Sequence, residues 1–599
     1  MKQGVIVGIT YLLHYRNQIY IYDSRSCDIM PYKIGISSGW WGIAKDPNLL
    51  GLYTKAGSFG ATAGVQFNQV DLDTILEFLE PDLKQFMDRM VKELGIEIGL
   101  HGEVREIVAL ESAERKYWEQ SHDRFVTTIK NASELGFVYV NMHLSVTQQL
   151  FYEEARIRPF GFSYQVVDHL GRAFWELAEQ SPAVKRHILR LLSRERSGMA
   201  GQVSGEEIYR RRRQAYSHQL NAEITAEALR RVRAAGQPET KDVVQGAFDE
   251  VVRELSDAGI LTEREANFLY GVWKDSTYAK YVVEAGEIDA YILVAIYMIE
   301  TGDPLWSGIV GPGYSNPDRD AELAYIEKQP EFNAAVAAKY MEGHLTKKDH
   351  TANKNLIKGI SAKEFLEKNK LMLALEMPQS GEGVEGLARF YNPLHSQYLI
   401  RKLNSPMISL CIDFEQTIGQ RIDVDKLLGT AKERDAKQEV PGDFGKLVFL
   451  IHVGEPVPYF GTAHIPIAIG GRGQDILYRW LYSLKQKGFK DGYILFERGG
   501  GRRPGDSSMF NVFEYSVWAL RQIVKHLDLD TKPNELPPEF YGLSFDNKDI
   551  YARQLVTVRD HAWDPLQDLL AIPEEKHTFL SRAAVDKGKR EEWERRKFR

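Results

Sequence analysis

Eight short runs of mostly apolar residues recur along the chain. They cover residues 32–37, 63–68, 96–101, 137–143, 371–376, 407–413, 447–452 and 492–497. Most segments between them repeat apolar residues every three or four positions, as in 73–94 and 114–135, which predicts amphipathic helices. Parallel strands that are buried on both faces read as nearly continuous apolar runs. The alternation of strand and helix therefore predicts an α/β fold, and its eightfold repetition predicts a (β/α)8 TIM barrel.

The alternation is interrupted once, between the fourth and fifth predicted strands. Residues 155–355 have mostly helical patterns with Gly- and Pro-containing breaks, which predicts a large, mostly α-helical insertion. Because barrel loops at this face bind substrates, we expect the insertion to cover the site or to contact the substrate. The predicted division of the chain is N-terminal strands at 1–30, the first half of the barrel at 31–154, the insertion at 155–355, the second half at 356–530 and a C-terminal extension at 531–599.

Composition narrows the class of protein. No apolar stretch of the 599-residue chain approaches the roughly 18 to 20 residues that a membrane helix needs, and the N-terminal residues do not resemble a secretory signal. Only Cys27 and Cys411 are present, so no disulfide framework is indicated. These features predict a cytoplasmic protein without a membrane partner. A formal net charge of −7 disfavours wholesale wrapping of nucleic acid but is compatible with a local basic groove, and the sequence does not indicate an oligomeric state.

Residues of metal-ligand type lie at the ends of six of the predicted strands. Four of them follow consecutive strands, namely Glu376, Asp413, His452 and Glu497, and two histidines end earlier strands, His101 and His143. One such residue alone is more often an exposed or loop-capping side chain. In a barrel of parallel strands, however, the C-terminal ends meet at one face, so six together converge. Carboxylate and imidazole donors suit Zn²⁺, Mn²⁺ or a similar ion, which predicts a metalloenzyme.

Two clusters of arginines suggest phosphate binding. The run Arg210, Arg211, Arg212 and Arg213 lies beside two tyrosines in the predicted insertion, and Arg498, Arg502 and Arg503 follow Glu497 in a glycine-rich segment. Arginine can bind phosphate through two parallel hydrogen bonds, and glycines expose backbone N–H groups. The alternatives are a solvated helix face for the first cluster and a flexible loop for the second.

Several motifs, in order, resemble one known superfamily. The strings KIGISSGWWG, GATAGVQFNQ, IGLHGEV, SELGFVYVNMHLS, LALEMPQSGEGVEGLARF, SLCIDFEQTIGQRID, FLIHVGEPVPYFGTAHIPIAIGGRG and YILFERGG are similar to the barrel motifs of the endonuclease IV and xylose-isomerase-like TIM-barrel superfamily. The resemblance covers about 28–150 and 365–525, and the chain would be a divergent member because of its insertion.

The resemblance implies roles for individual residues. Glu376, Asp413, His452 and Glu497 match the four-ligand site that the isomerases, epimerases and endonuclease IV share, and His101 and His143 match two histidines that hold a further zinc in endonuclease IV with Glu376 as the bridging ligand. The chain departs from the endonuclease pattern at two places, where Gln416 replaces a histidine and Thr462 replaces an aspartate. His464 alone would therefore hold a third ion weakly.

Three functions follow from these patterns. The first is a metal-dependent phosphodiester hydrolase of the endonuclease IV type, a DNA-repair nuclease that acts on nucleic acid through two metals, with Glu376, Glu497 and His101 in catalysis. The alternative is a sugar isomerase or epimerase, in which one cation chelates sugar oxygens and His101 and His143 contact the substrate. The third is a non-catalytic nucleic-acid-binding protein. The expected cofactor is one or two ions of Zn²⁺, or alternatively of Mn²⁺, Co²⁺ or Mg²⁺.

Overall fold

The structure is a computed structural model of the 599-residue chain. It describes residues 13–15, 18–20, 31–37, 65–71, 85, 89, 95–102, 110–113, 115–143, 167–172, 174–194, 222, 224–257, 290–348, 357–377, 389–456, 466–497 and 509–543.

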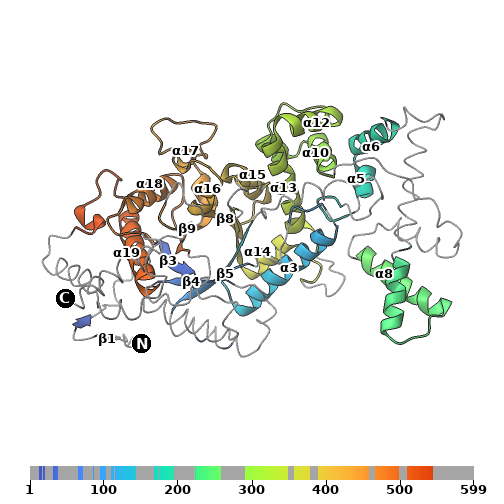
Figure 1. Ribbon diagram of the computed structural model, residues 1–599, viewed down its shortest axis with the longest axis horizontal. Helices are drawn as coiled ribbons and strands as arrows, with labels where there is room; N and C mark the ends of the chain where they lie inside the picture. The colour runs from blue at the N-terminus through green and yellow to red at the C-terminus, as the bar shows by residue number, and fades with distance from the viewer. Residues whose placement is uncertain are drawn as a thin grey trace, which may run out of the picture.

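Eight parallel strands form a closed barrel in the order β10-β3-β4-β5-β6-β7-β8-β9. Figure 1 labels β3, β4, β5, β8 and β9 of this barrel. The strands are β3 (Tyr32–Ser37), β4 (Phe67–Asp71), β5 (Glu97–His101), β6 (Tyr139–His143), β7 (Met372–Glu376), β8 (Ile408–Asp413), β9 (Val448–Val453) and β10 (Gly492–Phe496). The TIM-barrel prediction is confirmed. A separate antiparallel pair, β1 (Leu13–Tyr15) and β2 (Gln18–Tyr20), precedes the barrel.

Seven of the eight barrel strands lie where the apolar runs predict them, and one is displaced. The run at 63–68 predicts a strand that ends at Asn68, whereas β4 begins at Phe67 and continues to Asp71. The displacement arises because Asn68 and Gln69 are polar yet buried, at 2% and 0% exposure. An apolar pattern cannot detect such residues, which the closed barrel nevertheless removes from water.

Large aromatic rings fill the barrel interior and rely on glycines in neighbouring strands. Phe67 and Tyr139 belong to a buried cluster that also includes Tyr493 and lies apart from the main core. A Cβ atom on Gly35 would lie 2.3 Å from the ring of Phe67, and one on Gly99 would lie 2.0 Å from the ring of Tyr139. Both glycines are therefore required so that a ring can cross the neighbouring strand and fill the interior at normal packing density.

Helices surround the barrel and make up the described elements between β6 and β7 (Figure 1). They are α3 (Arg115–Leu135), α5 (Phe174–Gln180), α6 (Pro182–Arg194), α8 (Lys241–Asp257), α10 (Ala290–Thr301), α11 (Pro304–Ile309), α12 (Pro317–Glu327), α13 (Gln329–Thr346), α14 (Ala362–Asn369), α15 (Pro393–Leu403), α16 (Phe414–Gly419), α17 (Val424–Leu428), α18 (Arg472–Gln486) and α19 (Met509–Asp528), with 3-10 turns at Phe444–Leu447 and Pro538–Tyr541. The boundaries 155 and 355 of the insertion remain predictions. Within the described part of the chain, no helix combines the length and apolarity that crossing a membrane requires.

A buried ion network attaches the helices between β6 and β7 to the barrel wall. Nζ of Lys339 on α13 and Nζ of Lys402 on α15 each lie 2.7 Å from the carboxylate of Asp303, and both also contact Glu342. Asp303 additionally accepts a hydrogen bond from the backbone N–H of Leu305 and so caps α11. The network fixes α11 and α13 against α15, which follows β7.

Candidate metal centre

The four predicted ligands at consecutive strand ends meet at the C-terminal mouth of the barrel. Glu376 ends β7, Asp413 ends β8, His452 lies next to the end of β9, and Glu497 directly follows β10. One donor atom from each of the four residues lies within 4.8 Å of the others. A register shift in the β8–β9 pair places Asp413 directly opposite His452. The strand register therefore brings together residues that lie up to 121 positions apart in the chain (497 − 376).

His452 lies at the centre of this group. Its Nδ1 atom lies 2.8 Å from Oε2 of Glu497, 3.3 Å from Oε1 of Glu376 and 3.8 Å from Oδ2 of Asp413. Burial alone would lower the pKa of His452, but the neighbouring Cys411, Glu497 and Glu376 raise that pKa well above its ordinary value. The cluster thus favours a positive charge at the point that Nδ1 faces.

The carboxylates respond to the same field in different ways. Burial raises the pKa of Asp413 to about 6, with further increases from Glu497 and Glu376. Burial also acts to raise the pKa of Glu376, but the neighbouring His452 and His143 hold that pKa well below its usual range. Three carboxylates in one buried site repel one another, so the protein needs either protons or a cation to balance them.

The donor set fits a divalent cation. Oε1 of Glu376 and Nδ1 of His452 are buried and, among the described residues, have no hydrogen-bond partner. These two atoms lie close to each other, and Nδ1 also lies close to Oε2 of Glu497, but none of them is aligned for a hydrogen bond. Atoms that ligate one cation are arranged in this way. Carboxylate oxygens with one imidazole nitrogen are suitable ligands for Zn²⁺, Mn²⁺, Co²⁺ or Mg²⁺. The buried cluster could therefore bind a metal, whose identity the geometry does not specify.

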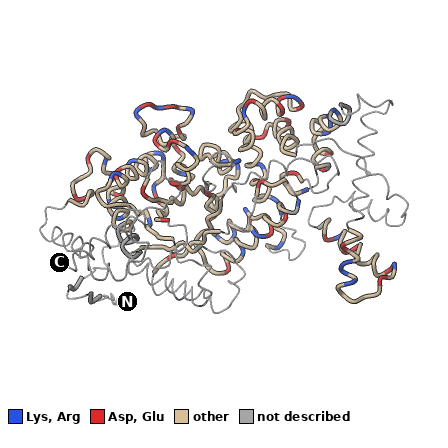
Figure 2. The backbone as a smooth tube through the Cα atoms, viewed as in Figure 1, with Lys and Arg blue, Asp and Glu red and all other residues tan. Residues whose placement is uncertain are grey.

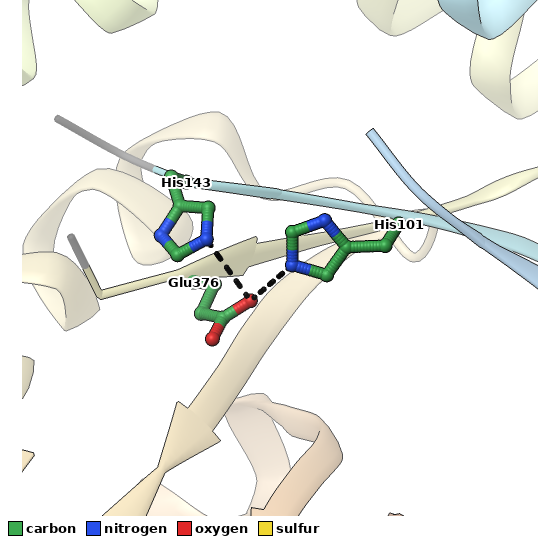
Figure 3. Close-up of side chains that lie close together, drawn as sticks. All are labelled: His101, His143 and Glu376. Atoms are coloured by element: carbon green, nitrogen blue, oxygen red, sulfur yellow. Dashed lines mark ion pairs between the residues drawn. The ribbon is translucent and has the colours of Figure 1, made fainter. Parts of the chain in front are cut away.

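His101 and His143 form a second group around the other oxygen of Glu376 (Figure 3). Nε2 of His101 lies 3.4 Å from Oε2 of Glu376, and Nε2 of His143 lies 3.9 Å from the same atom. Nδ1 of His143 lies 2.9 Å from the carbonyl oxygen of Met377, which can only accept a hydrogen bond, so Nδ1 carries the proton. Burial lowers the pKa of His143, so that its Nε2 keeps a lone pair. A lone pair that faces a carboxylate favours a second cation or a substrate hydroxyl between them.

Asp413 has two separate functions. Its Oδ1 accepts a hydrogen bond of 2.8 Å from the backbone N–H of Gln416 and so caps α16, while its Oδ2 faces His452. The hydroxyl of Thr417 donates to the carbonyl oxygen of Asp413 and reinforces this turn. The helix that follows β8 therefore holds the carboxylate in place, which frees one oxygen for the cluster.

Two residues in contact with the cluster are absent from the sequence-based prediction. Asn141 donates from Nδ2 to Oε2 of Glu376, and Gln69 accepts at Oε1 from the hydroxyl of Tyr139 while lying 3.3 Å from Nε2 of His452. Both are inside strands rather than at strand ends. The sequence does carry a signal for both residues, because alternate residues of a strand point to the same face. Asn141 lies two positions before His143, and Gln69 lies two positions after Phe67, so each polar residue shares a face with a residue that points into the barrel.

The predicted phosphate-binding arginines fall outside the described residues. These are Arg210, Arg211, Arg212, Arg213, Arg498, Arg502 and Arg503, and the weak ligand His464 also lies there.

Three described arginines that follow the first predicted cluster in the sequence are paired with glutamates. Arg231 lies 2.8 Å from Glu254, Arg230 pairs with Glu227, and Arg233 pairs with Glu239. Figure 2 shows basic and acidic segments together in this region, which includes α8. Because glutamates neutralise these arginines, they form a solvated face rather than a basic groove.

Comparisons with known proteins extend only to the fold. No family model and no curated protein matches the sequence. The chain is similar to a structure of L-ribulose 3-epimerase, with 9% identity, coverage of 83% of this chain and 95% of the other, and a TM-score of 0.35. It is also similar to D-psicose 3-epimerase in the presence of D-fructose, with 11% identity, coverage of 82% of this chain and 97% of the other, and a TM-score of 0.33. A third similar structure is a D-tagatose 3-epimerase-like protein, with 10% identity, coverage of 84% of this chain and 100% of the other, and a TM-score of 0.36.

The prediction of a phosphodiester hydrolase that acts on nucleic acid is wrong. The three structures named above are sugar 3-epimerases or a protein like them, and not endonucleases. The charge distribution agrees with this correction, because three described arginines that follow the predicted cluster, Arg230, Arg231 and Arg233, are paired with glutamates. The endonuclease IV assignment and the DNA-repair role have no support from these structures either.

Proposed function

We propose that this chain is a divalent-metal-dependent isomerase or epimerase that acts on a small sugar. The observation that supports this most directly is the charge of the site. Among the described residues, the ion pairs of Glu376, Asp413 and Glu497 are all with histidines, and no lysine or arginine contacts these carboxylates. An anionic substrate would therefore meet like charge, whereas a neutral polyhydroxylated substrate would not.

The charge count leads to the same substrate class. Three ionised carboxylates and one divalent cation leave a net charge of about −1 when the histidines are neutral. A site with this charge favours hydroxyl and carbonyl groups, which can donate to carboxylates and present neutral oxygens to a cation. His101 and His143 contribute two further imidazoles on one side of Glu376, where they can contact a sugar hydroxyl.

The chemistry requires that a proton move between a carbon atom and the enzyme. A bound divalent cation would act as a Lewis acid that makes the hydrogen next to a sugar carbonyl more acidic. Glu376 and Glu497 come from β7 and from the end of β10, and His452 lies between them. We assign the proton transfers to these two carboxylates because each has an oxygen at the buried mouth of the barrel, and His101 lies within 3.9 Å of both.

Solvent isotope exchange tests this function without knowledge of the exact sugar. The metal-free protein is loaded separately with Mn²⁺, Co²⁺, Mg²⁺ or Zn²⁺ and incubated in D₂O with a panel of ketoses and aldoses. We expect deuterium to appear at the carbon next to the carbonyl of at least one sugar, together with its epimer or isomer. The Glu497→Gln variant is the control, because it removes one proton acceptor. If all four loaded forms release every sugar unlabelled and unchanged, the proposal is refuted.

A further inference from the structure

We infer that Gln69 is a positioning residue for His452, because its amide oxygen holds the proton on Nε2 and so directs the bare Nδ1 toward the metal centre. The inference rests on the proposed function, since it assigns a role within the same metal site. Gln69 lies on β4 and His452 on β9, so the contact crosses the inside of the barrel. The two residues are 383 positions apart.

The contact is fully buried. Oε1 of Gln69 lies 3.3 Å from Nε2 of His452, and both residues have 0% exposure. The same oxygen accepts a hydrogen bond of 3.0 Å from the hydroxyl of Tyr139. Water therefore does not compete for either contact, and the amide is held between the aromatic interior and the charged mouth of the barrel.

The chemistry of the amide decides which nitrogen of His452 carries the proton. A carbonyl oxygen only accepts hydrogen bonds, so Nε2 must donate when Oε1 faces it. In the neutral ring Nδ1 then keeps its lone pair, and Nδ1 is the atom that faces Glu376, Asp413 and Glu497. A metal-ligating histidine commonly donates its other N–H to an oxygen, which fixes both tautomer and ring orientation.

Tyr139 favours the required orientation of the amide. Its hydroxyl shares Oε1 with His452, so a rotated amide would exchange this acceptor for an NH₂ group. The ring of Tyr139 can reach Gln69 because Gly99, on the intervening β5, has no side chain in its path. The glycine, the tyrosine and the glutamine thus form one buried connection that ends at His452.

Packing alone does not account for Gln69. Its Nε2 atom is buried and has no hydrogen-bond partner among the described residues, which destabilises the folded state. Leucine has a similar size and would remove this unpaired group, but it would leave the hydroxyl of Tyr139 and Nε2 of His452 without their acceptor. The accepting oxygen of the glutamine is thus the property that leucine lacks.

Metal affinity tests the inference without any sugar. Titration of the metal-free full chain with Zn²⁺ and with Mn²⁺ compares the wild type with Gln69→Leu and Gln69→Glu. We expect Gln69→Leu to weaken binding about tenfold to a hundredfold, as loss of such a contact typically does. Gln69→Glu should bind more tightly than Gln69→Leu, because its carboxylate still accepts from Nε2. Gln474→Leu is the matched control, since Gln474 is equally buried but, among the described residues, makes side-chain hydrogen bonds only with the backbone of Gly470 and Phe540.

The tautomer gives a second readout that packing would not change. Histidine labelled with ¹⁵N in the Zn²⁺-loaded protein should show a protonated Nε2 at His452 in the wild type and an altered signature in Gln69→Leu. Affinity and tautomer that match the Gln474→Leu control would overturn the role of Gln69 and leave the proposed enzyme intact. A wild type that binds neither metal would instead refute the proposed function and this inference together. Metal binding that depends on Gln69, without sugar turnover, would refute the proposed function alone.

Discussion

Nδ1 of His452, near the end of β9, lies 2.8 Å from Oε2 of Glu497, which directly follows the neighbouring strand β10. The two atoms are close but make no aligned hydrogen bond. Two buried donor atoms this close repel each other unless a proton or a cation lies between them. In the metal-free protein the proton is held on His452, whose pKa the surrounding carboxylates raise. Metal binding should therefore release a proton, since the ligand must be the neutral imidazole.

Glu376→Gln should abolish tight metal binding without unfolding the protein. The amide retains an oxygen that can accept from Asn141, but it is a poor metal ligand, and it does not carry the negative charge that His452 and His143 stabilise. We expect affinity to fall by about a hundredfold or more, with a metal-free protein that still unfolds cooperatively but at a lower melting temperature than the wild type. Elemental analysis and thermal unfolding measure the two quantities. Asp475→Asn, on the outer helix α18, is the control, and full metal occupancy in Glu376→Gln would contradict the ligand assignment.

Asp303→Ala should destabilise the fold strongly. The change removes one of the two carboxylates that Lys339 and Lys402 share, leaving Glu342 alone between two largely buried ammonium groups, and it removes the cap of α11. Breaking a buried ion network in this way costs about 3–5 kcal/mol. The exposed pair of Arg401 and Asp443 provides the comparison, since Asp443→Ala should cost less than about 1 kcal/mol. Chemical denaturation measures both, and equal costs for the two variants would show that the network is not a structural connection.

Stability should fall on acidification partly because of His344. Nδ1 of His344 lies 3.0 Å from Nδ1 of His122, and burial lowers the pKa of His344 to about 3. In the unfolded chain this histidine titrates near pH 6.5, so the unfolded state takes up the proton first. The contribution is complete above about pH 6.5 and is lost, at about 1.4 kcal/mol per pH unit, as the pH falls toward 3.

His344→Phe tests this pH dependence, because phenylalanine can still stack on Trp118 but does not titrate. We expect the variant to be less stable than the wild type at pH 7.5, because His122 loses its partner, but to lose less stability between pH 7.5 and pH 5. The metal centre titrates equally in both proteins, so the difference between the two slopes isolates His344. Parallel slopes in urea denaturation would contradict the prediction.

Two glycine substitutions should have opposite effects. Gly99→Ala places a Cβ atom 2.0 Å from the ring of Tyr139, so the tyrosine must move and the interior is overpacked, at about 1–3 kcal/mol or more. Gly246→Ala lies on the exposed face of α8 with nothing within 4 Å, and it should stabilise the helix by about 0.5–1 kcal/mol. Denaturation measures both changes. If Gly99→Ala were neutral, the close contact between β5 and the ring would not exist.

The sequence alone determined the barrel and the approximate position of the metal-ligand residues. Buried parallel strands need continuous apolar runs, so the run that ends at Glu376 or at Asp413 identifies both a strand and its last residue. In a barrel such strands have their C-terminal ends on one side, and this fixes which residues can meet. Those inferences depend only on local pattern and on general topology.

Only the tertiary structure decided what lies between the ligands and how their charges interact. Gln69 and Asn141 are polar residues inside strands, and no local pattern shows that closure of the barrel places them against His452 and Glu376. The pairing of Arg231 with Glu254 likewise depends on helix packing, so the sequence shows the arginine but not the carboxylate that neutralises it. Electrostatic partners are chosen by proximity in space, because Coulomb interactions depend on distance and burial and not on separation along the chain.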